Sequence, residues 1–286
     1  MKKFFTFHII TSSVFWTGAP LVIVEILRRG HYLSVLDEKL LPSPKKLLEC
    51  DALIDMSAIT NEKFYRTLEK EYKNRVQLGK KTPLMIDPPG AVIDSFDKNR
   101  THKHFRDLVP QAYTLRGHNN SKVFDHFKDD EYVVIKPKIG WGGKGVERIE
   151  LAQARDIYRE AKGVIVQKYI PFENGVGRII TLNHEGDFEI VASYLRVPHN
   201  SWRTGVDMKY TCVPHPVTKD LRQFTQTISM RCGLYLNGID YIYADGKYFL
   251  LEVNAVPAIK EPLETLGIDV PKKLLDHIER NVRVTQ

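Results

Sequence analysis

Three side chains late in the chain carry oxygen atoms of the kind that bind a hard metal ion. Glu252 and Asn254 lie two positions apart in LLEVNAVP, so on a strand they face the same way. Asp240 precedes them in GIDYIY, on the other arm of an expected hairpin. A two-residue turn at Asp245-Gly246 would turn Asp240 to the opposite face. A loop with an odd number of residues would bring the three together.

This trio is typical of a magnesium site, because Mg²⁺ takes one or two carboxylates together with phosphate oxygens of a substrate. The alternative is an edge strand that turns polar residues to solvent. Leu250, Leu251 and Val253 favour a buried strand, where unpaired carboxylates are costly.

A glycine-rich segment, VVIKPKIGWGGKGVERI, lies about a hundred residues upstream and holds Gly140, Gly142, Gly143 and Gly145. It matches the pattern G-x-G-x-x-G, but the residues after it alternate like a strand, whereas a dinucleotide-binding loop leads into a helix. No serine or threonine follows Lys144-Gly145 as in a P-loop. The segment therefore predicts a strand–loop–strand flap whose backbone N–H groups close over phosphates. A glycine-rich surface hairpin is the alternative.

Two lysines and a later strand complete a candidate nucleotide site. Lys136 ends the strand that enters the flap, and Lys98 lies where a helix is expected to begin. In IVQKYIPFENGVGR, free backbone groups at Lys168 and Ile170 would suit an adenine edge, and Glu173 the ribose hydroxyls. Taken singly, each of these is equally well a surface residue.

The elements around these residues fall into two patterns. Strands and helices alternate over residues 1–90, which predicts a parallel αβ module. The expected strands are Phe4–Ile10, Tyr32–Leu36, Ala52–Met56 and Leu84–Ile86, with helices at Leu21–Leu27 and around Phe64–Val76. Asp87-Pro88-Pro89-Gly90 is expected to end the last strand.

The rest of the chain predicts an α+β region with antiparallel hairpins. We expect helices over Phe96–Arg106, around Ala154–Ala161, around Leu221–Ile228 and after Asp269. The expected strands are Tyr132–Ile135, Val146–Ile149, Val164–Ile170, Ile179–Leu182, Phe188–Leu195, Ile239–Tyr243 and Tyr248–Asn254.

Composition limits the class of protein. The 286 residues are 43% hydrophobic with a net charge of +7, but the lysine pairs are scattered, so no nucleic-acid partner is expected. No apolar run reaches the length of a membrane span. Three widely spaced cysteines indicate a reducing compartment, and we expect a cytoplasmic location. The start MKKFFTFHIITSS imitates a signal peptide, but His8 and the hydroxyls favour a core strand.

The order of these parts resembles the ATP-grasp superfamily, and within it the RimK-type glutamate ligases, LysX-type ligases and bacterial glutathione synthetases. The resemblance covers nearly the whole chain and rests on DKNRTHKHF, VIKPKIGWGGKGV, VQKYI, GRIITL, LRVP, GIDYIY, LLEVNAVP and TLGIDV. It implies an ATP-grasp fold, α/β and α+β, in three domains: an N-terminal parallel αβ domain (1–92), a central lid (93–170) and a C-terminal antiparallel α+β domain (171–286).

The resemblance also implies roles for particular residues. It implies ATP and Mg²⁺ (or Mn²⁺) as cofactors, with magnesium at Asp240, Glu252 and Asn254 and catalytic contacts from Arg178 and Arg196. The implied ATP-binding residues are Lys98, Lys136, Gly140, Gly142, Gly143, Gly145, Gln167, Lys168, Tyr169, Ile170 and Glu173.

Three departures concern the hinge and the substrates. Val176 stands where many relatives have aspartate, and Lys168 where the hinge is often acidic. HNSWRTGVDMK replaces the usual asparagine and paired glycines, so Arg203 and Lys209 are candidate substrate residues or merely loop residues.

The implied activity is ADP-forming ligation, in which a carboxylate is activated as an acyl phosphate and joined to an amine. The expected partners are small-molecule or peptide substrates, and a homo-oligomer is left open. Two alternatives remain at this point: a kinase-like phosphotransferase and a non-catalytic ATP-binding module.

Overall fold

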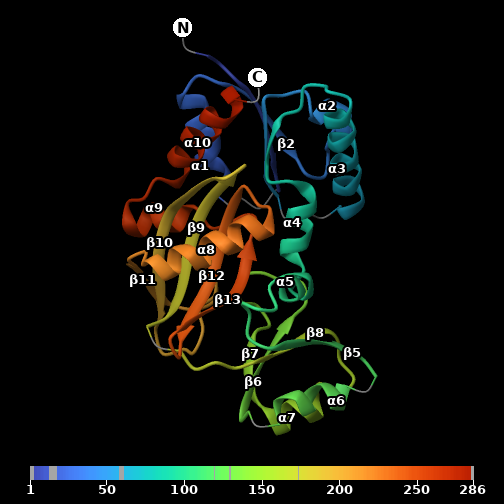
Figure 1. Ribbon diagram of the computed structural model, residues 1–286, viewed down its shortest axis with the longest axis vertical. Coiled ribbons are helices and arrows are strands. Elements are labelled where there is room, and N and C mark those ends of the chain that lie inside the picture. The colour runs from blue at the N-terminus through green and yellow to red at the C-terminus, as the bar shows by residue number, and fades with distance from the viewer. Residues whose placement is uncertain are drawn as a thin grey trace.

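The computed structural model describes residues 3–12, 18–57, 61–118, 120–128, 130–172 and 174–284, with side chains to residue 282. Three β-sheets organise this part of the chain (Figure 1). A four-stranded parallel sheet comes first, a four-stranded antiparallel sheet follows, and a five-stranded antiparallel sheet comes last. The expected fold class, an α/β part followed by α+β parts, is confirmed.

The N-terminal sheet has the order β2-β1-β3-β4 and is covered by helices on both faces (Figure 1). Phe7, Ile9 and Ile10 of β1 are fully buried, which agrees with a core strand at the start of the chain. The expected parallel αβ pattern of residues 1–90 is confirmed. The elements are β1 (Thr6–Thr11), α1 (Ala19–Arg28), β2 (Tyr32–Asp37), α2 (Pro44–Leu47), β3 (Ala52–Met56), α3 (Glu62–Gln77) and β4 (Leu84–Ile86).

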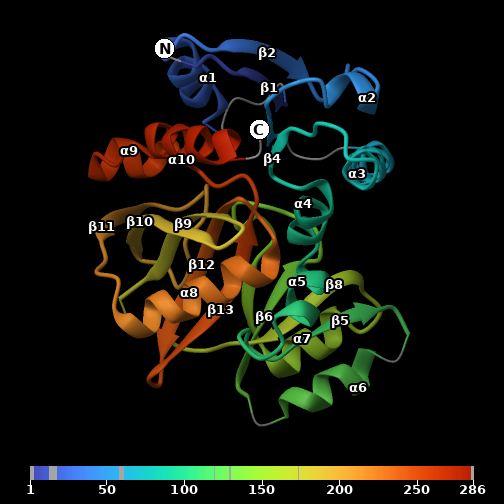
Figure 2. The same ribbon diagram turned by 45° about the horizontal axis from the view of Figure 1, so that its top comes forward.

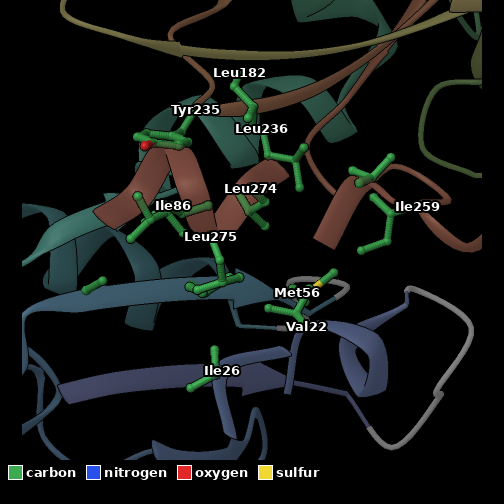
Figure 3. Packing of buried hydrophobic residues seen from close by; sticks show 14 of the residues in the cluster. Val22, Ile26, Met56, Ile86, Leu182, Tyr235, Leu236, Ile259, Leu274 and Leu275 are labelled. Atoms are coloured by element: carbon green, nitrogen blue, oxygen red, sulfur yellow. The ribbon is translucent and has the colours of Figure 1, made fainter. Parts of the chain in front are cut away.

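The last helix, α10 (Val270–Val284), returns to this N-terminal layer and packs beside α1. Leu274 and Leu275 of α10 share one core with Val22 and Ile26 of α1 (Figure 3). Residues of the five-stranded sheet join the same core, so the first and last parts of the chain form one packed body. The domain boundaries at 92/93 and 170/171 stay a prediction.

Two short helices, α4 (Pro89–Phe96) and α5 (Lys98–His104), lead from the N-terminal sheet toward the second sheet (Figure 2). The helix expected over Phe96–Arg106 is present as the shorter α5, because Asp97 is extended and caps α5 by accepting from the Asn99 amide at 2.9 Å. The segment expected to end β4 does so, since β4 stops at Ile86, and it also opens α4: Pro88 is the N-cap and Pro89 the first residue, where a missing N–H costs nothing.

The second sheet has the order β5-β8-β6-β7 and lies within the predicted lid, residues 93–170 (Figure 1). Helices α6 and α7 contribute Phe124 and Ala154 to a small core beneath it. Strand β5 was not expected, because its sequence AYTLR buries only one residue. The elements are β5 (Ala112–Arg116), α6 (Asn120–Phe124), the 3₁₀ helix η2 (Asp125–Phe127), β6 (Tyr132–Pro137), β7 (Glu147–Glu150), α7 (Leu151–Ile157) and β8 (Lys162–Lys168).

The third sheet has the order β11-β10-β9-β12-β13, with α8 packed on one face. Its hairpins turn at Glu185-Gly186 and Asp245-Gly246, and all four residues have positive φ, as a two-residue type I′ turn requires. The elements are β9 (Val176–His184), β10 (Asp187–Pro198), β11 (Tyr210–Pro214), α8 (Lys219–Cys232), β12 (Leu236–Ala244), β13 (Lys247–Asn254) and α9 (Lys260–Leu266).

None of the helices in the described part of the chain combines the length and the apolar character that a bilayer crossing demands.

Candidate active site

A β-bulge in the last hairpin decides where the acidic trio lies. The turn has two residues, since Ala244 pairs with Lys247, and this alone would put Asp240 on the opposite face from Glu252. The register shifts between Asp240 and Tyr241, and Asp240 then pairs directly with Glu252. Gly238 pairs with Asn254 in the same register. The expectation that only an odd-length loop unites the trio is therefore wrong, because the bulge supplies the extra residue within the strand.

The same face of the sheet carries a row of paired charges. Arg178 on β9 lies directly beside Asp240 and donates from Nε and Nη2, the latter at 2.7 Å from Oδ2. The Arg178 side chain is only 6% exposed. Burial and nearby Arg196 would lower the pKa of Arg178, but Asp240 outweighs both and the pKa is raised. Each Asp240 oxygen keeps a second lone pair for another ligand.

Lys98, on the helix that leads to the second sheet, contacts this row of charges. Its Nζ lies 2.9 Å from Glu252 Oε1 and donates to the Gly140 carbonyl at 2.6 Å. One ammonium group therefore touches both the acidic trio and the glycine flap. Lys98 lies in the first turn of α5, which contacts β13, so the helix sets this position.

Lys136 is buried at 5% exposure near the end of β6. Its burial lowers its pKa to about 7; Glu252 opposes the shift and Lys98 adds to it. The two lysines and Glu252 are thus electrostatic neighbours. An ammonium whose pKa is lowered in this way gains by meeting an anion.

The flap folds toward the loop that joins β10 to β11. Gly142, Gly143 and Gly145 have positive φ, so three of its four glycines adopt a backbone that other residues avoid. The Val206 amide donates to the Gly142 carbonyl at 3.0 Å. This contact joins the flap to that loop.

The hinge expected at Gln167–Ile170 follows directly from β8. Gln167 is 3% exposed, and its Nε2 has no hydrogen-bond partner in the described part of the structure. The Lys168 amide donates to the Gln111 carbonyl at 2.8 Å, so the expectation that this amide is free is wrong. The residue before β5 pairs with it, an arrangement that no local sequence pattern indicates. Glu173 lies outside the described residues.

Of the arginine and lysine candidates that remain, Arg196 lies in the charged row, and Arg203 and Lys209 lie outside it. Arg196 lies on the face of Arg178 and pairs with Glu261 of α9. Arg203 bonds Asp207 at 3.0 Å within its own loop, close to Gly143. Lys209 is exposed at the end of that loop and makes no ion pair within the described residues.

Two groups of residues were missed at the sequence level. Glu261 accepts from Arg196, Tyr194 and Tyr210; burial would raise its pKa, but Arg196 and these hydroxyls lower it to about 2. Arg148 lies 5.0 Å from the ring centres of Tyr132 and Tyr169 and 5.9 Å from that of Trp202. Neither group has a local sequence signal, since each joins separate elements.

Within the described chain, no group of three or more Asp, Glu, His or Cys side chains is placed to hold a metal by itself. The trio offers two carboxylates and one amide. That set suits Mg²⁺ when phosphate oxygens complete its coordination. The arrangement of cations, flap and acidic row is therefore suited to a nucleoside triphosphate with its metal.

Fold and site together define an ATP-grasp ligase. The solved structure of the ATP-grasp ligase PsnB with a minimal precursor superimposes on 96% of this chain and 98% of that one, with a TM-score of 0.71 and 16% identity. D-alanine–D-alanine ligase from Bacillus anthracis gives a TM-score of 0.66 at 16% identity, covering 98% of each chain. At these identities the likeness concerns the fold alone.

The family follows from the sequence comparison. The model of the RimK-like ATP-grasp domain matches residues 109–278, and the chain belongs to this family. The coenzyme gamma-F420-2:alpha-L-glutamate ligase of Methanococcus maripaludis is 28% identical over 204 residues, 67% of this chain and 69% of that protein. The alpha-aminoadipate–LysW ligase LysX of Saccharolobus solfataricus is 28% identical over 179 residues, 60% and 65% of the two chains.

The protein is thus an ATP-dependent carboxylate–amine ligase, an enzyme that forms carbon–nitrogen bonds. ATP-grasp ligases use ATP and Mg²⁺, and one solved structure of PsnB holds Mg and ADP.

Proposed function

We propose that this enzyme activates a carboxylate as an acyl phosphate and then joins it to the amine of an amino acid or peptide. The observation that carries the proposal is the contact of Lys98 with both Glu252, at 2.9 Å, and the flap carbonyl of Gly140, at 2.6 Å. A single phosphate chain placed there would meet the cations, the acidic trio and the flap.

The triphosphate would replace the internal partners of Lys98 and would lie against Lys136. Asp240, Glu252 and Asn254 would hold Mg²⁺, which when bound neutralises charge on the phosphate oxygens. The fit is supported by their shared face and by the lone pairs that Arg178 leaves free on Asp240. Arg178 holds Asp240 in place, as outer partners of metal ligands do. Mn²⁺ would suit the same oxygen ligands.

The adenine would lie at the hinge. Gln167 supports this position, because its buried Nε2 lacks a partner and would donate to a ring nitrogen. The Lys168 carbonyl and the Tyr169–Ile170 backbone supply the other edge. Glu173 is the candidate for the ribose hydroxyls.

The reaction would proceed in two balanced steps. A carboxylate oxygen attacks the γ-phosphorus, the bond to ADP breaks, and an acyl phosphate forms. The amine then attacks the acyl carbon, the carbon–oxygen bond to phosphate breaks, and the amine loses a proton. Two anions must meet in the first step, so Lys98, Lys136 and the flap amides lower its barrier by neutralising charge. The closed flap protects the acyl phosphate from water.

The substrates would enter beside the arginine row. Arg196 would contact the acyl substrate if it exchanges part of its bonding to Glu261, and Arg203 and Lys209 lie on the loop that closes the flap. Related proteins are named alpha-L-glutamate ligases, which makes L-glutamate the first amino acid to test. We place the enzyme in the cytoplasm and leave a homo-oligomer open.

The test is a screen of paired carboxylates and amines, including L-glutamate and glutamyl peptides, that follows release of phosphate and ADP. The proposal predicts release only when both substrates are present, with an amide product by mass. A stable phosphorylated product without amine would indicate a phosphotransferase. Tight ATP binding without turnover would indicate a binding module, and AMP as product would contradict the acyl-phosphate route.

A further inference from the structure

Helix α5 carries a buried side chain that the expected site leaves without a role. His102 is 8% exposed and lies four residues after Lys98, so the two side chains leave the helix on the same side. The Nε2 atom of His102 has no hydrogen-bond partner among the residues that the structure describes. A buried polar atom without a partner is costly, so a bound group is the natural candidate to satisfy it.

The surroundings of His102 select the charge of that group. Burial, together with Lys136 and Lys98, holds the pKa of the imidazole down at about 2, so the ring is neutral near pH 7. A neutral ring has one N–H donor and one acceptor nitrogen. Two ammonium groups beside it repel a cation and attract an anion. An oxyanion that accepts from the Nε2–H would therefore meet both the ring and the lysines.

We propose that His102 donates its Nε2–H to a phosphate oxygen of the bound nucleotide and is a third phosphate-binding residue beside Lys98 and Lys136. This inference rests on the proposed function, because it adds a contact within the same nucleotide site. A third ammonium in this buried place would increase repulsion between the cations. A neutral imidazole adds a donor without adding charge.

The same helix offers a matched control. His104 lies two positions further along α5, is exposed, and has its Nε2 2.9 Å from the Arg231 carbonyl. The change His104→Leu removes the same kind of side chain from the same helix but on its outer side. It should leave nucleotide binding unchanged.

The experiment measures binding of ADP with Mg²⁺ to the full chain by calorimetry, and of adenosine by competition. His102→Leu removes the donor and should weaken ADP binding about tenfold or more, because hydrogen bonds to charged groups are the strong ones. Adenosine lacks phosphate, and its affinity should not change. His102→Gln keeps an N–H at a similar reach and should recover part of the loss. In turnover, the KM for ATP should rise more than kcat falls.

Two results would overturn the inference. One is wild-type affinity for ADP in His102→Leu. The other is an equal loss for ADP and adenosine, which would show a merely structural role. If His102→Leu does not fold, His102→Met, unbranched and similar in size, serves in the same comparison. A wild-type chain that binds neither ADP nor ATP would instead contradict the proposed function itself.

Discussion

Two regions of the molecule bury carboxyl groups in opposite ways. At the carboxyl ends of the N-terminal strands, Asp55 and Asp87 are 6% and 2% exposed, and neither meets a cation within the described residues. On the five-stranded sheet, Asp240 pairs with Arg178 and Glu252 with Lys98. Burial raises the pKa of Asp55 to about 6 and that of Asp87 well above its usual value.

The difference shows how buried acids are tolerated. Burial without a cation favours the protonated forms of the N-terminal pair, and one Asp87 oxygen accepts from the amides of Tyr235 and Leu236. The acids on the sheet instead meet opposite charges, Asp240 on Arg178 and Glu252 on Lys98. The first region therefore buries its acids without ion pairs, whereas the second carries the residues proposed to bind the metal.

The change that separates the regions most strongly is Asp240→Asn. It leaves the Arg178 guanidinium buried without its partner, which should cost about 3–5 kcal/mol of unfolding free energy. It also removes a proposed metal ligand, so kcat should fall by about 10²–10³. Urea unfolding and amide formation measure the two effects. An Asp240→Asn enzyme with wild-type stability would show that the pair does not neutralise charge as described.

The same substitution at Asp55 should act in the opposite direction. The folded pKa of about 6 exceeds the ordinary value of 3.8, so the folded state binds the extra proton. This stabilisation is complete below pH 3.8 and is lost as pH rises through 6, about 3 kcal/mol in total. Asp55→Asn should remove that part of the pH dependence and make the protein more stable than wild type at pH 7.

The control for Asp55 is Asp37→Asn, an exposed position at the end of β2. It should keep the wild-type dependence of stability on pH between 4 and 7. If Asp55→Asn keeps that dependence too, protons do not neutralise the N-terminal acids.

Lys136 allows the charge balance of the candidate active site to be tested through pH. A bound nucleotide should raise the pKa of Lys136 from about 7, so binding takes up a proton. Affinity for ADP should then fall as pH rises above 7, by at most about tenfold per pH unit. Calorimetry in buffers of different ionisation enthalpy measures the proton. Lys136→Met should bind ADP weakly, and its affinity should not change with pH in this way. If the affinity of the wild-type protein for ADP does not change with pH, Lys136 does not take up a proton on binding.

The smallest effect concerns the contact of lid and loop around Arg148. Arg148→Ala removes its contacts with Tyr132, Tyr169 and Trp202. It should lower the free energy of unfolding by about 0.5–2 kcal/mol. The change in Trp202 fluorescence on adding ADP should also differ between Arg148→Ala and the wild type. Arg155→Ala, which removes a partly exposed lid ion pair with Asp125, is the control. Equal effects of the two would show that the Arg148 cluster does not join lid and loop.

The sequence allowed the fold to be predicted, because the signals were local. Buried runs such as Ala52–Met56 and the turn residues Asp245-Gly246 determine nearby structure by themselves. The fold class and the ligase activity are confirmed. The roles of the separate site residues stay proposals.

What could not be predicted depends on contacts between distant elements. The bulge beside Asp240 has no sequence mark, yet it decides on which face of the sheet this proposed metal ligand lies. Glu261 satisfies Arg196 from a helix 65 residues away. His102 looks like an ordinary surface residue until its burial beside two lysines is seen.

The most direct test of the central claim follows oxygen through the reaction. The carboxylate substrate found in the screen is labelled with ¹⁸O in its carboxyl group and turned over with ATP and the amine. An acyl phosphate transfers one of these oxygens, so the account predicts one ¹⁸O in the phosphate released for each amide formed, with ADP as the other product. Unlabelled phosphate, or AMP in place of ADP, would contradict it.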